Sequence, residues 1–324
     1  MTPVAVIGAG AYGTALAIAI AKTGRPVQLW ARTTEQAEAL ANQRENSRRL
    51  PGVGLPPSVQ PTGLIADIKA NATLLLAIPA QATETFLRQC GDALPSAPVV
   101  LAAKGISLDD SRLQTEIASA LLPERQFAVL SGPGFADEIA RGFPTALTLA
   151  ASDRHLVSTL QDSLSTPTLR LYTSTDILGV QLGGALKNVV ALACGMCAGA
   201  GLGESARAAL MTRGFAEMQR LAKAMGADPA TLAGLSGLGD LALSSASQKS
   251  RNFAAGYRLG ARAVAAEGQT VEGIATARAT VTLASRHNVE MPIAAAVTKV
   301  LNGELDVAGA MQALLARPQR EETA

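Results

Sequence analysis

Residues 4–24, VAVIGAGAYGTALAIAIAKTG, decide the fold of the N-terminal half of the chain. The apolar run 4–7 predicts a buried strand, and the alanine-rich run after Gly13 predicts a helix that ends at Gly24. Between them, Gly8 allows a tight turn, Gly10 lets the backbone approach a pyrophosphate, and Gly13 lets the helix pack closely on the strand. The stretch therefore predicts the opening unit of a Rossmann-like, dinucleotide-binding sheet. A glycine turn used only for packing is the alternative.

Strand and helix patterns then alternate along the chain, which predicts a parallel, doubly wound sheet. By contrast, residues 46–61 are rich in proline and glycine and predict a loop. The predicted helices after the first are 34–42, 81–89 and 111–121, and the predicted strands after the first are 27–30, 73–78, 99–103, 127–130, 145–150 and 169–172.

The pattern changes after Asp176, where helical stretches replace strands. Residues 176–200 are apolar on nearly all sides, as in a helix buried in a core. We therefore predict an α/β chain in which an N-terminal Rossmann-like doubly wound sheet is followed by an all-helical C-terminal domain. The predicted division gives a dinucleotide-binding domain at 1–185 and a helical substrate-binding and catalytic domain at 186–324.

The composition excludes several classes of protein. With 324 residues, 48% of them hydrophobic and 17% charged, the chain can bury two cores and is not a disordered chain. Its net charge of +2, spread along the sequence, argues against a nucleic-acid partner. No basic region precedes the apolar stretch at the N-terminus, so we expect no targeting signal, no membrane insertion and a cytoplasmic location.

Cysteines and histidines give no sign of a disulfide framework or a metal site. The three cysteines are an odd, low number, and His155 and His287 lie far apart. Cys194 and Cys197 have the spacing of a redox pair, but they lie within the apolar segment 176–200 and are interpreted as core residues.

Arg32 bears on the choice of cofactor. An acid at the end of the second strand would hold the ribose hydroxyls of NAD, whereas an arginine there can hold a 2′-phosphate. The sequence thus favours NADP(H) over NAD(H). A solvated charge at Arg32, with Glu35 nearby, is the alternative.

Two lysines are candidates for the chemistry. Lys104 directly follows the strand 99–103, and ligands of open α/β sheets bind at the carboxyl ends of strands. Lys187, followed by Asn188, lies inside the apolar helix, where desolvation lowers the pKa of an amine toward the range of an acid–base group. The alternatives are a surface lysine at 104 and a lysine at 187 that extends to the surface.

Three polar segments leave their interpretation open. Asp240 ends a glycine-rich loop and either pairs with a buried lysine or caps a helix. Ser250-Arg251-Asn252 precedes a predicted helix and is either an anion site or a capped helix start with an exposed arginine. SGPGFA at 131–136 follows a strand and either approaches a ligand closely or is an ordinary loop.

Taken together, eight segments resemble the bacterial-type NAD(P)-dependent glycerol-3-phosphate dehydrogenase family over nearly the whole chain. They are GAGAYGTALA at 8–17, AAKG at 102–105, SGPGFA at 131–136, GVQLGGALKNVVAL at 179–192, RAALMTRGFAEM at 207–218, GLSGLGDL at 234–241, SRN at 250–252 and VEG at 271–273.

The resemblance implies a reversible reduction of dihydroxyacetone phosphate to glycerol 3-phosphate, which supplies phospholipid synthesis. The implied partner is this small phosphorylated triose, and a homodimer is possible. The residues that the resemblance places at the cofactor are Gly8, Gly10, Ala11, Tyr12, Gly13, Arg32, Lys104, Ala136, Arg251, Thr270 and Glu272.

It also implies the substrate contacts and the catalytic roles. Lys187 is the implied proton acceptor in alcohol oxidation, while the charge of Lys104 stabilises developing negative charge on the substrate. Asp240 is the third implied catalytic residue. The substrate contacts are Lys104, Gly132, Gly134, Lys187, Asn188, Asp240, Ser250, Arg251 and Asn252.

The chain departs from the family pattern at two positions. Gly134 replaces a serine or threonine, so that a hydroxyl contact is missing and the backbone must serve, and Thr270 stands where valine is common. Two other functions stay open from sequence alone. One is a lysine-based dehydrogenase of hydroxy acids, which needs no phosphate site, and the other is a non-catalytic dinucleotide sensor, which needs no buried lysine.

Overall fold

An eight-stranded sheet forms the centre of the N-terminal half, in the order β10-β9-β8-β7-β6-β1-β2-β5. The structure is a computed structural model that describes residues 2–263 and 271–318. Its main-sheet strands are β1 (Val4–Ile7), β2 (Val27–Trp30), β5 (Val59–Thr62), β6 (Thr73–Leu76), β7 (Val99–Leu101), β8 (Phe127–Ser131), β9 (Thr145–Ala150) and β10 (Leu169–Ser174).

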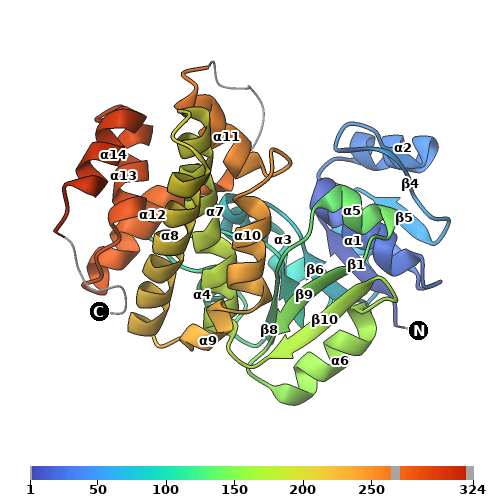
Figure 1. Ribbon diagram of the computed structural model, residues 1–324. Coiled ribbons are helices and arrows are strands. Elements are labelled where there is room, and N and C mark those ends of the chain that lie inside the picture. The colour runs from blue at the N-terminus through green and yellow to red at the C-terminus, as the bar shows by residue number, and fades with distance from the viewer. Residues whose placement is uncertain (1, 264–270, 319–324) are drawn as a thin grey trace.

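Helices cover both faces of this sheet (Figure 1). Alternate residues of β1 belong to separate cores, Val4 and Val6 to one and Ala5 and Ile7 to the other. This confirms the predicted doubly wound arrangement. The helices of this half are α1 (Ala11–Ala21), α2 (Thr34–Gln43), α3 (Thr83–Cys90), α4 (Gln114–Leu121), α5 (Ala136–Arg141) and α6 (Arg154–Leu164), with short 3-10 turns at Ile65–Asp67, Ala80–Ala82 and Gly91–Ala93.

The prediction of a wholly parallel sheet is wrong at one place. Strands β8 and β9 are antiparallel, with Leu130 opposite Leu149, whereas the other neighbours in the sheet are parallel. The helix between them, α5, has six residues and spans about 9 Å. The five residues of β8 span about 17 Å. The chain does not return to the start of β8, and β9 runs back beside β8 from the end where β8 stops.

The predicted loop at 46–61 is also wrong, because this segment contains strand structure. Strands β3 (Glu45–Asn46) and β4 (Leu50–Gly54) form a small antiparallel sheet, and β5 adds to the main sheet beside β2. β5 contains Pro61, which lacks a backbone N–H group. The position is tolerated because β5 is an edge strand, where one side needs no ladder of hydrogen bonds.

The C-terminal half is built from helices packed around α7, as predicted (Figure 1). α7 contains an 18-residue stretch that is apolar enough to span a membrane. Because 89% of this stretch is buried inside the protein, α7 is a core helix. The helices are α7 (Ile177–Gly199), α8 (Glu204–Ala224), α9 (Pro229–Leu232), a π-helical turn at Leu235–Gly239, α10 (Asp240–Ser244), α11 (Arg251–Gly260), α12 (Glu272–Arg286), α13 (Pro292–Leu301) and α14 (Val307–Leu315).

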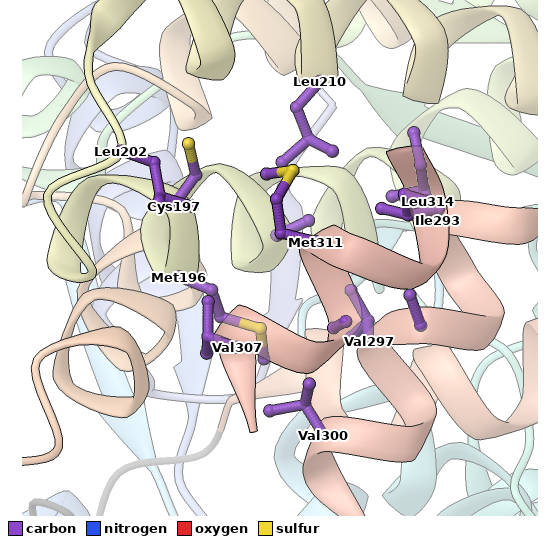
Figure 2. A pocket seen from close by; sticks show the side chains of 13 residues that line it. Met196, Cys197, Leu202, Leu210, Ile293, Val297, Val300, Val307, Met311 and Leu314 are labelled. Carbon is purple, nitrogen blue, oxygen red and sulfur yellow. The ribbon is translucent and has the colours of Figure 1, made fainter. Parts of the chain in front are cut away.

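An apolar cavity of about 40 Å³ lies between α7, α8, α13 and α14, away from the lysines (Figure 2). Hydrocarbon and sulfur side chains line it, so it offers a charged ligand no polar partner. The side chains that Figure 2 labels around it are Met196, Cys197, Leu202, Leu210, Ile293, Val297, Val300, Val307, Met311 and Leu314.

Glycines bring α7 and α11 into backbone contact. A Cβ atom on Gly256 would lie 2.0 Å from the carbonyl oxygen of Leu192, and one on Gly260 would lie 2.1 Å from that of Met196. Gly195 meets the α11 backbone in the same way, with 2.1 Å to the Phe253 carbonyl oxygen. Because real Cβ atoms do not approach so closely, these positions accept glycine alone, and they fix α11 against α7.

We expect Gly256→Ala to destabilise the protein by about 1–3 kcal/mol or more, because the added methyl group forces the two helices apart. Urea unfolding measures the effect. Gly54→Ala is the matched control, since its Cβ would meet only the Arg44 carbonyl oxygen, at 3.7 Å. Equal stabilities of the two variants would show that the helices do not need this approach.

Candidate active site

A single buried carboxylate joins the two candidate lysines. The Nζ of Lys187 lies 2.9 Å from Oδ1 of Asp240, and the Nζ of Lys104 lies 2.6 Å from Oδ2 of the same residue. The side chains of Lys187 and Asp240 are 8% and 3% exposed, and that of Lys104 is 14% exposed. The structure thus brings together three residues that are far apart in sequence, and neither lysine extends into solvent.

Glycines on α7 explain how Asp240 reaches Lys187. A Cβ on Gly183 would lie 3.0 Å from the backbone of Gly237 in the π-helical turn. Gly183 and Lys187 share one face of α7, since they are four residues apart. The π-helical segment can therefore pack against α7 at a position four residues before Lys187. Asp240, the first residue of α10, then contacts the Lys187 amine. Asp240 thus pairs with buried lysines, while the residue before α10 is Gly239, so Asp240 does not cap this helix.

Lys104 comes from the sheet, at the carboxyl end of β7, as the sequence predicts. Its Nζ donates to the carbonyl oxygen of Gly132, 2.8 Å away, directly after β8. The same amine lies 5.6 Å from the centroid of the Tyr12 ring at the start of α1. Lys104 therefore connects the glycine turn, the loop after β8 and the helical half of the protein.

The charges in this cluster shift the pKa values of its members in different directions. Burial lowers the pKa of Lys187, and the nearby Lys104 charge lowers it further, against the opposing charge of Asp240. Burial is the largest single effect on Lys104 and acts to lower its pKa, but the charge and hydrogen bond of Asp240, together with Tyr12 and Glu272, raise that pKa overall. Burial acts to raise the pKa of Asp240, but the two lysines outweigh it and hold it below its ordinary value. Lys187 is thus the amine best suited to exchange a proton.

A chain of amides ties the cluster to α11 and α12. Nδ2 of Asn188 donates to the carbonyl oxygen of Lys104 at 2.9 Å, and Nδ2 of Asn252 donates to Oδ1 of Asn188 at 2.7 Å. Oδ1 of Asn252 accepts from the backbone N–H of Gly273 at 2.9 Å. These side chains therefore hold the site together.

Ser250, Arg251 and Glu272 lie at the starts of two of these helices. The Oγ of Ser250 caps α11 by accepting from the N–H of Phe253 at 3.3 Å, while Arg251 is exposed. Burial is the largest effect on Glu272 and raises its pKa, and the charges of Arg251, Lys187 and Lys104 oppose it. The structure thus shows a capped helix start with an exposed arginine. This arrangement does not exclude an anion site at the same helix start.

The glycine turn has the shape that a dinucleotide phosphate requires. Gly8 has φ +117°, and a Cβ on Gly13 would lie 2.0 Å from the Gly8 carbonyl oxygen, so both need glycine. At Gly10, by contrast, an added Cβ would meet nothing within 4 Å, which leaves room for a ligand. No side chain caps the N-terminus of α1, which begins at Ala11. The hydroxyl of Tyr12 is buried without a partner among the described residues. The residues present therefore fit a dinucleotide.

The structure also places three further residues that the sequence predicts at the cofactor or the substrate, namely Arg32, Ala136 and Gly134. Arg32 is exposed just after β2, the neighbour of β1, and Ala136 begins α5. A Cβ on Gly134 would lie 2.9 Å from Cδ1 of Ile139, so a larger residue there requires that side chain to move. Thr270 lies outside the described residues.

The cysteines behave as core residues. Cys194 and Cys197 are buried free thiols in α7, and burial raises the pKa of Cys194 to about 11. A thiol with so high a pKa is a poor nucleophile. Within residues 2–263 and 271–318, no group of three or more histidine, cysteine, aspartate or glutamate side chains is arranged to hold a metal ion.

Sequence reasoning missed Ser244. Its Oγ accepts from Nζ of Lys187 at 2.7 Å and donates to Oδ1 of Asp240 at 3.1 Å. The signal was present, because Ser244 follows Asp240 by four residues and lies on the same face of α10. The closeness of α10 to Lys187, however, is visible only in the structure.

The sheet, its glycine turn and the buried lysine–carboxylate cluster define a dinucleotide-dependent dehydrogenase with a helical C-terminal half. Residues 3–157 match the N-terminal profile of NAD-dependent glycerol-3-phosphate dehydrogenase, and residues 176–312 match its C-terminal profile. The chain therefore belongs to the NAD-dependent glycerol-3-phosphate dehydrogenase family.

Curated relatives and solved structures agree with this assignment. The chain is 51% identical to the glycerol-3-phosphate dehydrogenase, NAD(P)+, of Paracoccus denitrificans and 49% identical to that of Roseobacter denitrificans, covering 98% of this chain and 99% of each relative. A crystal structure of glycerol-3-phosphate dehydrogenase from Coxiella burnetii superposes with a TM-score of 0.93 at 34% identity, covering 98% of this chain and 99% of the other. A 2-dehydropantoate 2-reductase from Methylococcus capsulatus shares the fold alone, with a TM-score of 0.60 at 15% identity.

We expect Ser244→Ala to move the alkaline limb of dihydroxyacetone phosphate reduction to lower pH. We expect reduction to need Lys187 in its charged form, so the rate should fall as the pH rises through the lowered pKa of that amine. Removing an acceptor of its N–H group disfavours the charged form further. At the alkaline end, kcat/KM should fall about 10-fold below wild type. Ser244→Thr, which keeps the hydroxyl, should restore the profile, and an unmoved limb in Ser244→Ala would contradict this role.

Proposed function

We propose that this protein is a glycerol-3-phosphate dehydrogenase that reversibly reduces dihydroxyacetone phosphate to sn-glycerol 3-phosphate with NADPH or NADH. The observation that carries the proposal is the buried amine of Lys187, held 2.9 Å from Asp240 with a lowered pKa at the carboxyl edge of a dinucleotide-binding sheet. A non-catalytic sensor would have no use for this amine, because burying a lysine is costly. Membership in the family supports the same substrate.

The protein's part in the reaction follows from the cluster. When bound, the nicotinamide supplies the hydride that reaches C2 of the substrate. Lys187 donates a proton to the oxygen on C2 during reduction and accepts it back during oxidation. The charged Lys104 stabilises the negative charge that develops on this oxygen. Asp240 holds both amines at a fixed separation and remains ionised because both lysines lower its pKa.

The phosphate of the substrate is assigned to the start of α11. The unpaired N–H groups of its first turn and the exposed guanidinium of Arg251 attract an anion. Ser250 and Asn252 keep this turn in place through their hydrogen bonds to Phe253 and Gly273.

The cofactor is assigned to the glycine turn and its surroundings. Gly8, Gly10, Ala11, Tyr12 and Gly13 would face its phosphates, and the exposed Arg32 would attract a 2′-phosphate, which favours NADP(H) over NAD(H). Further contacts to the cofactor and to the substrate are assigned at Lys104, Gly132, Gly134, Ala136, Asn188, Arg251, Thr270 and Glu272.

We further propose that residues 1–185 form the dinucleotide-binding domain and residues 186–324 the helical substrate-binding and catalytic domain, with each domain contributing some contacts to the other's ligand. The division falls inside α7, so one continuous helix joins the two functions. A cytoplasmic location, supply of phospholipid synthesis and a homodimer complete the proposal.

The decisive experiment compares the initial rate of dihydroxyacetone phosphate reduction by wild type with that by Lys187→Met. We expect the variant to lose about 10²–10⁴-fold in kcat, because the acid–base group is gone while most of the side-chain length remains. Lys223→Ala, at an exposed lysine of α8, is the control. Near-wild-type turnover by Lys187→Met, or turnover of hydroxy acids in place of the triose by wild type, would reject the proposed function.

Arg251→Ala should raise the KM for dihydroxyacetone phosphate about 10- to 150-fold, because a charge-assisted hydrogen bond contributes about 1.5–3 kcal/mol. The KM should change more than kcat, since the phosphate is remote from the reacting carbon. Arg258→Ala, farther along the same helix, is the control. An unchanged KM would place the anion site elsewhere.

A further inference from the structure

Asn46 contacts the glycine turn from the segment 46–61, whose prolines and glycines predict a loop. We propose that Asn46, assisted by Gln36, is a positioning residue that orients the Ala9–Gly10 peptide so that the Gly10 N–H group faces the phosphates of the dinucleotide. This inference rests on the proposed function, because it assumes that the glycine turn binds a dinucleotide.

The amide of Asn46 uses both of its N–H groups on the turn and on the helix that follows. Its Nδ2 donates to the carbonyl oxygen of Ala9 at 3.1 Å and to Oγ1 of Thr14 at 2.8 Å. Asn46 is 4% exposed and Thr14 is fully buried, so water does not compete for these bonds. Nε2 of Gln36, on α2, reaches the same Ala9 oxygen at 3.4 Å. The carbonyl of one turn residue is thus held from two different elements.

Holding the Ala9 carbonyl also sets the direction of the next N–H group. A trans peptide is planar, and its C=O and N–H bonds point in opposite directions. Because the Ala9 oxygen faces Asn46, the Gly10 N–H must point away from Asn46. An added Cβ at Gly10 would have nothing within 4 Å, so there is open space beside this residue for a ligand. Asn46 therefore prepares a phosphate-facing donor without touching the phosphate.

Asn46 is itself fixed by the chain on either side of it. Arg44 ends α2 with φ 51°, and its guanidinium donates to the carbonyl oxygens of Val59 at 3.1 Å and Leu55 at 3.2 Å. The Leu55 N–H donates in return to the Arg44 carbonyl oxygen at 2.7 Å. The segment between Arg44 and Val59 is therefore closed on itself, and it holds Asn46, the last residue of β3, against Thr14 of α1.

This arrangement predicts an effect on affinity and not on the chemical step. Neither hydrogen bond of the Asn46 amide involves Lys104, Lys187 or Asp240. Without Asn46, the turn samples other peptide orientations, and binding must restore the competent one. Once the cofactor is saturating, the turn is ordered and turnover should proceed as in wild type.

The test measures dissociation constants for NADPH and NADH by fluorescence titration, together with kcat, both KM values and Tm. Asn46→Ala removes the amide, and Asn46→Asp keeps its shape but, when ionised, has no N–H donor. Asn71→Ala, at an exposed asparagine before β6, is the matched control. Both Asn46 variants should bind NADPH about 10-fold more weakly or worse. Their kcat at saturating cofactor and their KM for dihydroxyacetone phosphate should stay within about 2-fold of wild type.

The outcomes separate this inference from the proposed function. Wild-type affinity in the Asn46 variants, even with a lowered Tm, would overturn the positioning role and leave a purely structural one. If wild type itself bound neither NADPH nor NADH, the proposed function would fail and this inference with it. Should Asn46→Ala not fold, Asn46→Asp supplies the same comparison. Gln36→Ala should then show a smaller loss of affinity, in keeping with its longer hydrogen bond.

Discussion

The buried carboxylate of Asp240 is the group on which the rest of the site depends. It accepts from Lys104 of the sheet half and from Lys187 of the helical half, at 2.6 and 2.9 Å. Two like charges would repel each other in this dry interior, and one shared carboxylate keeps them together. Two charged lysines and one carboxylate carry a net charge of +1. This excess positive charge suits a reaction that develops negative charge on its substrate.

Close backbone approach makes this cluster possible. Gly183 lets the turn before Asp240 pack closely on α7, and the glycines at 195, 256 and 260 bring α11 alongside the same helix. Asn252 then donates to Asn188 at 2.7 Å, which joins the start of α11 to the site. The position of a charged side chain thus depends on residues that have no side chain at all.

The glycine turn after β1 also depends on close backbone approach. Gly8 and Gly13 lie where added side chains would collide with backbone or with neighbouring residues, whereas Gly10 faces open space. Tyr12 links this turn to Lys104 through the approach of the amine to its ring, at 5.6 Å. The glycine turn and the lysine–carboxylate cluster are therefore neighbours through the first residues of α1.

The sequence by itself determined the order of elements, the glycine turn and the buried character of Lys187, because local patterns of apolar residues and glycines act over a few neighbours. It did not determine the antiparallel β9 or the edge strand β5, since their direction and pairing depend on the length of the connections and on free sheet edges. Only the tertiary structure decided that Asp240 pairs with both lysines, that Ser244 contacts Lys187, and that Asn46 reaches the glycine turn. These contacts join residues up to 136 positions apart, and no local pattern encodes which distant side chains meet.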